Sequence, residues 1–459
     1  MSFGASLAQL VEVLDAEPLN LTELELAKNA TGITTDSRHV ASGELFLALR
    51  GEQFDGHTFV KKAIQQGAIA AVVDRYPPEF GLKANPKIPL LRVKDTLAAY
   101  QTIARWWRDQ FTIPVIAITG SVGKTTTKEL IAAVLSTQGQ VLKTQANYNN
   151  EIGVPKTLLQ LGTEHDYAVV EMGMRGSGEI ALLTQIARPD IAVITNVGTA
   201  HIERLGSEQA IANAKCELLA EMPATGLAIL NHDNIRLLET AAQVWQGKTV
   251  TFGLEGGDIQ GKLLDSQTLQ VGETNFLLPL PGRHNALNYL AALAVAQVLQ
   301  VNWTLLTQGL ILELPKGRAQ RYNLPNDIVI LDETYNAGLE SMTAALDLLA
   351  QTPGQRHIAV LGTMKELGDR SIELHHQVGT VVQQLHLDHL LILAEAAEAE
   401  AMATGAEPVP VEKFPSHAAL LERLKSLVRP GDRLLFKASR AVALDQAVDQ
   451  FVDYLKSSH

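Results

Sequence analysis

Cysteine is almost absent from the sequence, with Cys216 as the single example among 459 residues. Intramolecular disulfides and metal clusters held by several thiolates are therefore excluded. Long apolar runs are lacking too. The longest, residues 286–299, contains Asn288 and Gln297 and is shorter than the roughly 20 residues that span a bilayer. The N-terminus has no basic segment ahead of an apolar one, which is unlike a signal peptide. We expect a cytoplasmic protein that is not inserted in a membrane.

Positive charge is also scarce, because 38 Lys and Arg residues face 50 Asp and Glu residues, for a formal net charge of -12. This balance argues against nucleic acid as a partner. An anionic ligand would have to be held by local Lys and Arg side chains. Apolar residues make up 46% and charged residues 19% of the chain, a composition that favours folded cores over disorder.

Short apolar runs alternate with helical patterns along the whole chain, which predicts an α/β protein. At about 150 residues per domain the length suggests roughly three domains. We place them at residues 1–94, 95–314 and 315–459. The first domain contains one strand-helix-strand pattern, over residues 46–74.

Near-continuous apolar strands of the second and third domains are typical of parallel sheets that are covered on both faces. Residues 249–281 differ, because their short alternating runs predict a small antiparallel flap. The predicted strands of the second domain are 115–119, 167–171, 191–196 and 227–231, and those of the third are 328–332, 357–362, 389–394 and 433–438.

A glycine-rich segment follows the strand at 115–119 and precedes a helix. Such a turn lets backbone N–H groups wrap phosphate oxygens at the positive end of the helix. Lys124 would reach the β- and γ-phosphates of a nucleotide, and the Thr125 hydroxyl would ligate Mg²⁺. The alternative is a tight turn with a surface lysine. The chain has no Asn-Lys dipeptide for guanine recognition. The candidate nucleotide-binding residues here are Gly120, Ser121, Val122, Gly123, Lys124, Thr125 and Thr126.

From this loop onward the motifs resemble those of the Mur ligase family, the ATP-dependent enzymes that build the peptide stem of peptidoglycan. The family loop reads G-[ST]-x-G-K-[ST]. The other segments that carry the resemblance are EMGMRGSGEI, NVGTAHIERLGS, IANAKCELL, GRHNALNYLAA, LPKGRAQRY, VILDETYNA and LGTMKELGDRSIELHHQVG. The resemblance covers nearly the whole chain. It implies three domains, with a central P-loop parallel-sheet ATPase domain and a Rossmann-like C-terminal domain.

The resemblance also implies a magnesium site. Glu171 and His201 follow predicted strands, and ligands of open parallel sheets sit beyond the carboxyl ends of strands. A carboxylate such as Glu171 suits Mg²⁺ by its chemistry alone, whereas His201 taken by itself is an ordinary loop histidine. The family match makes His201, Thr125 and Lys215 further metal ligands. Lys215, which alone reads as a solvated lysine, would be carbamoylated and would thereby become an anion.

The remaining nucleotide contacts are implied by segments of the second and third domains. Asn288 would contact the base, although asparagines at this position could simply cap a helix. Arg318 would meet phosphate, and Asp332 or Glu333 would hold the ribose. The implied catalytic set is Lys124, Lys215, His201 and Arg318.

Candidate substrate residues come from all three domains. Ser37 and Arg38 match the region that holds the uridine nucleotide, and the Arg38 guanidinium suits an anionic phosphate. The alternative for this segment is a turn-forming Asp-Ser-Arg. The other implied substrate residues are Asn147, Asn149, Asn150, Tyr335 and Asn336.

The expected reaction is ATP-dependent ligation of D-alanyl-D-alanine to UDP-N-acetylmuramoyl-tripeptide through an acyl phosphate, by a monomer that requires ATP and Mg²⁺. Two alternatives stay open. One is a sister amide ligase, either the ligase that adds the third stem residue or a folylpolyglutamate synthase, both disfavoured by the YNA and MKELG segments. The other is a nucleotide-driven switch without synthetic chemistry.

Overall fold

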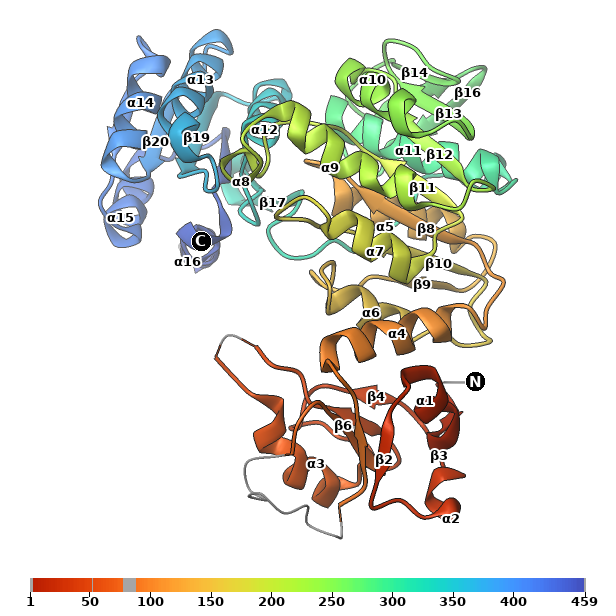
Figure 1. The fold of residues 1–459 in the computed structure, drawn as a ribbon. Coiled ribbons are helices and arrows are strands. Elements are labelled where there is room, and N and C mark those ends of the chain that lie inside the picture. The colour runs from red at the N-terminus through yellow and green to blue at the C-terminus, as the bar shows by residue number, and fades with distance from the viewer. Residues whose placement is uncertain (1–2, 52, 77–87, 458–459) are drawn as a thin grey trace.

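The computed structural model describes residues 3–51, 53–76 and 88–457. It shows three lobes in chain order (Figure 1). The N-terminal lobe lies below the central lobe, and the C-terminal lobe lies beside the central lobe and above a wide gap. Within the described ranges, no helix combines the length and the apolar character needed to cross a membrane.

The N-terminal lobe contains a five-stranded sheet in the order β2-β7-β6-β5-β4. The strand-helix-strand pattern expected over residues 46–74 is confirmed as β5, α3 and β6, and Gly67 caps the C-terminal end of α3. The elements of this lobe are β1 (Ala5–Ser6), α1 (Leu7–Leu14), β2 (Glu17–Leu19), α2 (Glu23–Leu26), β3 (Asn29–Ala30), β4 (Ile33–Thr34), β5 (Leu45–Leu47), α3 (Val60–Gln66), β6 (Ala70–Val73) and β7 (Leu90–Arg92).

The central lobe is built on a nine-stranded sheet in the order β16-β15-β14-β13-β12-β11-β8-β10-β9. Its elements are α4 (Thr96–Arg108), β8 (Val115–Thr119), α5 (Lys124–Leu135), β9 (Val141–Lys143), α6 (Gly153–Leu158), β10 (Tyr167–Glu171), α7 (Glu179–Ala187), β11 (Ile191–Ile194), α8 (Ile202–Leu205), α9 (Glu208–Glu221), β12 (Leu227–Asn231), α10 (Ile235–Val244), β13 (Lys248–Gly253), β14 (Ile259–Leu263), β15 (Thr268–Val271), β16 (Thr274–Leu277) and α11 (Arg283–Val298).

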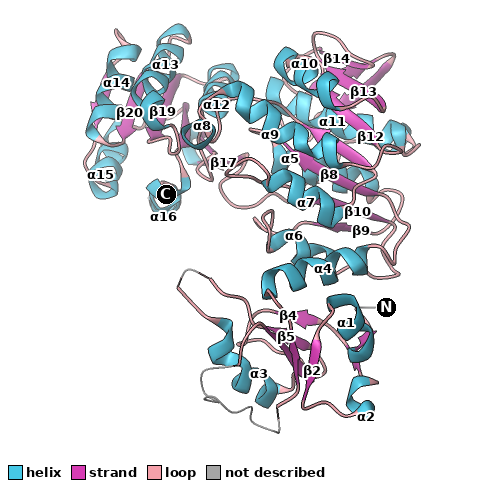
Figure 2. Ribbon diagram, viewed as in Figure 1, coloured by secondary structure: helices cyan, strands magenta, loops and turns pink. Residues whose placement is uncertain are grey.

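Helices cover both faces of this sheet, as Figure 2 shows. Alternate residues of β8 explain why, because Val115 and Ala117 join one apolar cluster while Ile116 and Ile118 join another. The first cluster includes α4, α7 and α9, and the second includes α5 and α11. A strand that is buried on both sides must be apolar throughout, which is the pattern the sequence shows.

The expected antiparallel flap at 249–281 is wrong in part. Strand β13 pairs in parallel with β12, and β14 pairs in parallel with β13. Only β14, β15 and β16 pair with one another in antiparallel fashion. The alternation of exposed and buried residues that suggested a flap lies in β14 and β15, near the edge of the sheet, and not in β13.

The C-terminal lobe has a six-stranded sheet in the order β17-β18-β22-β19-β20-β21, in which only β17 is antiparallel. The four strands expected in this region are confirmed as β18, β19, β20 and β22. Its elements are β17 (Gln320–Leu324), β18 (Ile328–Asp332), α12 (Leu339–Gln351), β19 (Arg356–Gly362), α13 (Ser371–Gln384), β20 (His389–Leu393), α14 (Ala396–Ala406), β21 (Val411–Lys413), α15 (His417–Leu427), β22 (Asp432–Lys437) and α16 (Asp445–Ser457).

Candidate active site

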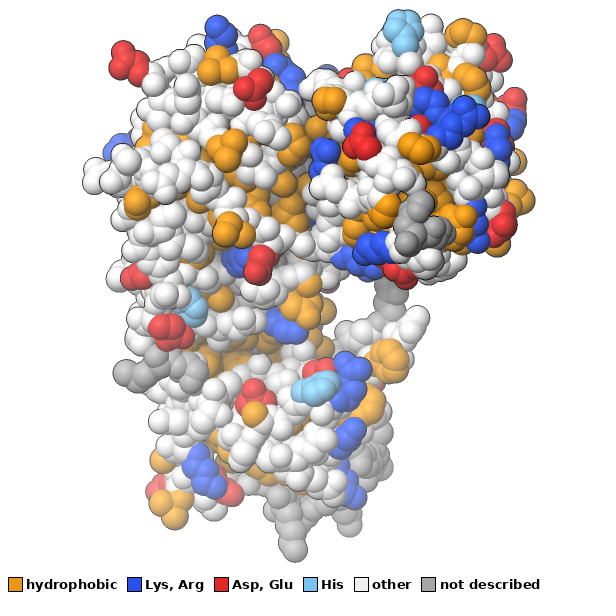
Figure 3. Space-filling model, turned by 180° about the vertical axis from the view of Figure 1, so that it is seen from behind, with side chains coloured by type: hydrophobic (Ala, Val, Ile, Leu, Met, Phe, Trp, Pro, Cys, Tyr) orange, Lys and Arg blue, Asp and Glu red, His pale blue; other side chains and the backbone are white. Residues whose placement is uncertain are grey.

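A cavity of about 950 Å³ is lined by residues of the central and C-terminal lobes. Seen from behind in the space-filling view of Figure 3, a wide opening separates the N-terminal lobe from the C-terminal lobe. The described lining is rich in charged side chains of both signs, with six Lys or Arg residues and six Glu residues. The six cationic residues of the lining are Lys124, Arg175, Arg318, Lys365, Lys437 and Arg440.

Three neighbouring strands bring their carboxyl ends to one edge of the central sheet. Glu171 at the end of β10 pairs with Ile118 of β8, and Ile194 at the end of β11 pairs with Thr119. The segments that follow these strands therefore emerge side by side. This is the edge at which open parallel sheets bind ligands.

The glycines of the phosphate loop are required by close contacts. A Cβ atom on Gly120 would lie 1.9 Å from Oγ1 of Thr195, and a Cβ atom on Gly123 would lie 2.4 Å from Oδ1 of Asn288. Both glycines also have positive φ angles, of 155° and 83°, and the 83° of Gly123 lies in the left-handed region, which side chains disfavour. The loop is held in place by the Asn196 side chain, which accepts a hydrogen bond from the Val122 N–H at 3.0 Å.

Lys124 is the first residue of α5, and the preceding Gly123 offers no side chain to cap the helix. The first N–H groups of α5 are thus left for an anion. Lys124 Nζ folds back over the loop and donates to the carbonyl oxygen of Gly120 at 2.7 Å. Burial lowers the pKa of Lys124, an effect that the negative charge of Glu171 opposes.

Glu171 is a buried carboxylate with one oxygen engaged and one free. Asn149 Nδ2 donates to Glu171 Oε1 at 2.8 Å. Glu171 Oε2 is buried and has no hydrogen-bond partner among the described residues; its nearest cation, Lys128 Nζ, lies 3.9 Å away. A buried carboxylate oxygen without a partner is costly, and a bound cation would satisfy it.

His201 follows β11 and lines the cavity. Its Nδ1 lies 2.6 Å from Oε2 of Glu366, a residue of the C-terminal lobe. The imidazole beside Glu366 lowers the pKa of that carboxyl group. Across the described part of the chain, no three His, Cys, Asp or Glu side chains are grouped closely enough to hold a metal ion by themselves.

Lys215 lies on α9 with only 1% of its surface exposed. Burial, reinforced by the positive charge of Lys124, lowers its pKa well below the ordinary lysine value. It is not among the residues that line the cavity. Lys215 is therefore a buried residue, which contradicts the expectation of a solvated lysine.

Asn288 lies on α11 and accepts a hydrogen bond from the Thr127 hydroxyl at 3.2 Å, which links it to the helix of the phosphate loop. Its amide donates to Oδ1 of Asn285 at 3.4 Å. The N-cap of α11 is Gly282, so Asn288 does not cap this helix. Asn288 and Asn285 both line the cavity.

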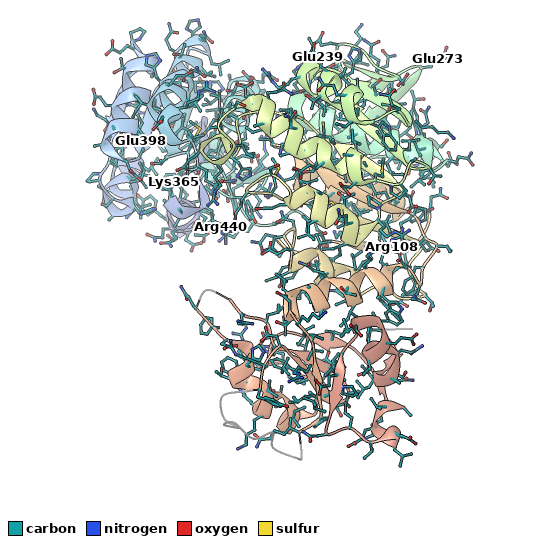
Figure 4. All side chains as sticks on the ribbon, viewed as in Figure 1. Arg108, Glu239, Glu273, Lys365, Glu398 and Arg440 are labelled. Atoms are coloured by element: carbon teal, nitrogen blue, oxygen red, sulfur yellow. The ribbon has the colours of Figure 1, made fainter. Side chains whose placement is uncertain are left out.

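In the C-terminal lobe, the Tyr335 ring of the cavity lining has two guanidinium groups close to it. The Arg318 group lies 4.0 Å and the Arg440 group 5.1 Å from the ring centroid. Arg318 Nε is buried without a hydrogen-bond partner among the described residues. Figure 4 labels Arg440 and Lys365 on the C-terminal lobe. This side of the cavity therefore presents fixed positive charge opposite the phosphate loop.

Of the two carboxylates expected at the ribose, only Glu333 lines the cavity. Burial raises the pKa of Glu333, against the opposing charges of Lys437 and Arg318. Asp332 is fully buried, and its Oδ1 accepts hydrogen bonds from the backbone and hydroxyl of Thr334 at 3.0 and 2.6 Å. Of these two carboxylates, Glu333 is therefore the one that can contact a ligand in the cavity.

The expected substrate residues fall into two groups. Ser37 and Arg38 belong to the N-terminal lobe and do not line the cavity, and Arg38 pairs with Asp36 at 2.7 Å. The others do line it: Asn147, Asn149, Asn150, Tyr335 and Asn336. Asn150 also accepts a hydrogen bond from the N–H of Gly153 at 2.9 Å, at the start of α6.

Three family models match the chain: the Mur ligase middle domain over residues 118–296, the "Mur ligase, glutamate ligase domain" over 317–440, and the "Mur ligase family, catalytic domain" over 29–105. The chain belongs to the Mur ligase family. Among curated proteins, this Mur ligase is 56% identical to the UDP-N-acetylmuramoyl-tripeptide–D-alanyl-D-alanine ligase of Synechocystis sp., over 98% of both chains. It is 38% identical to the Escherichia coli ligase of the same name, over 97% of this chain and 98% of that one.

Solved structures agree with these matches. MurF from Acinetobacter baumannii superposes on this Mur ligase with a TM-score of 0.88 at 33% identity, covering 98% of this chain and 99% of that one. MurF from Thermotoga maritima, crystallised with ADP, gives a TM-score of 0.83 at 29% identity, covering 96% and 100%. The expected α/β fold with the three-domain Mur ligase architecture is confirmed.

Sequence reasoning assigned no role to several residues that line the cavity from the C-terminal lobe. Lys365 and Glu366 lie in the MKELG segment, Lys437 ends β22 and Arg440 follows it, and Glu340 lies in the first turn of α12. The MKELG segment carries part of the family resemblance, but nothing in the spacing of these residues indicates that they face the phosphate loop of another lobe.

Proposed function

We propose that this Mur ligase joins D-alanyl-D-alanine to UDP-N-acetylmuramoyl-tripeptide at the expense of ATP, a step of peptidoglycan biosynthesis. The observation that carries the proposal is the 56% identity, over 98% of both chains, to the Synechocystis ligase of that name. The phosphate loop, together with the Lys and Arg side chains that line the cavity, supplies the chemistry that the reaction needs.

The free carboxylate of the tripeptide is a poor electrophile. The γ-phosphoryl group of ATP moves to that carboxylate, which gives an acyl phosphate and ADP. The amine of the dipeptide then attacks the acyl carbon, loses a proton, and expels phosphate to leave the new amide bond. Lys124 would neutralise charge on the transferring oxygens, which is the main requirement of phosphoryl transfer.

We place ATP on the phosphate loop, with Asn288 at the base, Glu333 at the ribose and Arg318 at the phosphates. The ADP-bound Thermotoga maritima structure supports nucleotide binding. The unpartnered Nε of Arg318 supports an anion on that side of the cavity. One cavity is lined by His201, Asn288, Arg318, Glu333 and residues 121–126 of the phosphate loop. Gly120 is not among its lining residues.

One observation supports Mg²⁺ at this site: Glu171 Oε2 is buried and has no hydrogen-bond partner among the described residues. Thr125 and His201 line the same cavity, and phosphate oxygens would complete a coordination shell that the protein leaves open. Lys215 would contribute as a carbamate, and burial, which lowers its pKa, acts in the direction that carbamate formation requires. When bound, Mg²⁺ would offset negative charge on the phosphate oxygens.

The UDP-sugar would extend toward the N-terminal lobe, where Ser37 and Arg38 would hold the uridine nucleotide. Asn147, Asn149 and Asn150 would contact the sugar-peptide where it enters the cavity. We retain the division into residues 1–94, 95–314 and 315–459, since each span contains one of the three large sheets.

The dipeptide carboxylate calls for a cation on the C-terminal side, and Arg440 is the exposed arginine there. Arg440→Ala is expected to raise the KM for D-alanyl-D-alanine by about 10- to 100-fold, the range of a charged hydrogen bond. The KM for ATP should change little. Arg423→Ala removes an arginine that pairs with Glu412 on the same lobe and should leave both constants unchanged. Steady-state kinetics with a normal dipeptide KM in Arg440→Ala would contradict the assignment.

A panel of amine acceptors tests the proposed function against a sister ligase. With ATP and UDP-N-acetylmuramoyl-tripeptide supplied, amide formation is expected with D-alanyl-D-alanine and not with lysine, diaminopimelate or glutamate. Product masses identify the acceptor that is used. Preferred use of glutamate, or of a third stem residue on the dipeptide form of the UDP-sugar, would replace the proposal with one of the sister activities.

A further inference from the structure

The segment between β11 and α9 carries His201 and is also where the C-terminal lobe contacts the central lobe. The Thr199 N–H and hydroxyl both donate to the Glu340 carboxylate, at 2.6 and 3.2 Å. Gly368 of the C-terminal lobe packs so closely on Glu203 that a Cβ atom there would lie 3.2 Å from the Glu203 Cβ. One short segment thus serves both the cavity and the contact between lobes.

His201 and Glu366 form the centre of this contact. Besides the 2.6 Å contact between His201 Nδ1 and Glu366 Oε2, the Glu203 N–H donates to the backbone carbonyl of Glu366 at 3.3 Å. Both partners adopt left-handed backbone conformations, with φ of 68° at His201 and 63° at Glu366. Non-glycine residues hold such conformations only where their surroundings impose them, and they cluster at functional sites.

We propose that Glu366 is a positioning residue that fixes the orientation of the His201 imidazole from the other lobe. Docking of the C-terminal lobe on the central lobe would then orient the imidazole at the same time. With Nδ1 held by Glu366, Nε2 is the ring nitrogen left for a ligand in the cavity. A carboxylate on the second nitrogen is the usual way to orient a ligating histidine. The proposal deepens the proposed function and rests on it only for the identity of that ligand.

A simple exposed ion pair would not have this effect, because such pairs contribute little. Here the pair is supported by a backbone hydrogen bond, a second carboxylate contact at Thr199 and a glycine close approach. By thermodynamic linkage, if docking of the C-terminal lobe strengthens ligand binding at His201, a ligand bound to His201 must favour docking by the same free energy. Metal affinity and lobe docking are therefore expected to change together.

The test compares the full-length wild type with Glu366→Ala, Glu366→Gln and the control Glu400→Ala. Glu400 pairs with Lys413 entirely within the C-terminal lobe, so its loss should change nothing. Small-angle scattering without nucleotide is expected to give a larger radius of gyration for Glu366→Ala alone. Mn²⁺ binding in the presence of ATP, followed by electron paramagnetic resonance, is expected to weaken about 10- to 100-fold in the same variant.

Glu366→Gln keeps an oxygen that can accept from Nδ1–H and should restore most of both properties, which also guards against a folding defect in the alanine variant. Wild-type scattering and Mn²⁺ affinity in Glu366→Ala would overturn the proposal. A larger radius with unchanged Mn²⁺ affinity would also overturn it, since Glu366 would then only hold the lobes. If the wild type formed no amide product while Glu366→Ala still changed both readouts, the proposed function would fail and the positioning role would stand.

Discussion

Lys124→Ala is expected to lower kcat by about 100- to 1,000-fold or more, the loss seen when one group that stabilises transition-state charge is removed. Among the described residues, Lys124 Nζ donates hydrogen bonds to backbone carbonyls of its own loop, those of Gly120 at 2.7 Å and Ser121 at 3.4 Å. Its removal therefore takes nothing from the apolar cores. Far-UV circular dichroism and the Tm should stay close to those of the wild type, while ADP release is measured at saturating ATP.

Lys248→Ala serves as the matched control, because Lys248 is an exposed lysine on β13 of the same sheet. It should retain wild-type kcat. A near-normal kcat for Lys124→Ala at saturating ATP would rule out the phosphate-loop assignment and leave Lys124 as an ordinary lysine in a tight glycine turn.

Lys215→Ala and Lys215→Arg are both expected to be nearly inactive, because Lys215 is proposed to work as a carbamate and not as a cation. A protonated lysine next to Mg²⁺ would be repelled by about 8 kcal/mol at a separation near 4 Å and an effective dielectric constant of about 20, because the metal ion carries two charges. A carbamate reverses the sign of that interaction. Short carboxylates such as formate or acetate should restore part of the activity of Lys215→Ala, since they can occupy the vacated space.

The carbamate can be observed directly. Wild-type enzyme equilibrated with ¹³C-bicarbonate is expected to show a carbamate carbonyl resonance that is absent from Lys215→Arg. Because the reaction with CO₂ requires the neutral amine, the lowered pKa of Lys215 favours it, and acidification should remove the signal together with activity. Near-normal activity of Lys215→Arg, with its folding verified by thermal melting, would contradict the carbamate role.

Much of the fold could be predicted because local pattern and final burial agree. Strands β8, β10, β11 and β12 are apolar at nearly every position, and the sheet buries them on both faces. The phosphate loop was also predictable, since the glycines that its contacts require at 120 and 123 are visible in the sequence. In the buried strands and in the phosphate loop, the same steric and burial requirements determine both the residue types and the structure.

Other elements were missed because their signal is weak. Strands β9 and β21 have three residues each, and only Leu142 of β9 is fully buried. The Ala- and Glu-rich stretch near residue 400 reads as a solvated helix end, yet it forms α14, which packs on α13 where Gly379 and Gly405 permit close approach. In the sequence alone, small residues that allow close helix packing resemble a low-complexity segment.

The candidate site divides in a similar way. Glu171 and Lys124 could be found because each follows a strand of one sheet, and parallel strands deliver their ends to one edge. His201 also follows such a strand, but only the family resemblance singled it out. Glu366 and Arg440 could not be found in this way, because they meet the cavity only through the docking of one lobe on another. The burial of Lys215 was also missed, since a lysine on a helix normally faces solvent.

The most direct test of the central claim is ADP release measured with UDP-N-acetylmuramoyl-tripeptide, with and without D-alanyl-D-alanine, alongside the mass of the UDP-linked product. We predict that ADP and phosphate form in step with UDP-N-acetylmuramoyl-pentapeptide, and only when ATP and both co-substrates are present. Steady ADP release that is indifferent to the dipeptide, without any pentapeptide product, would contradict the account and identify a nucleotide-driven switch instead.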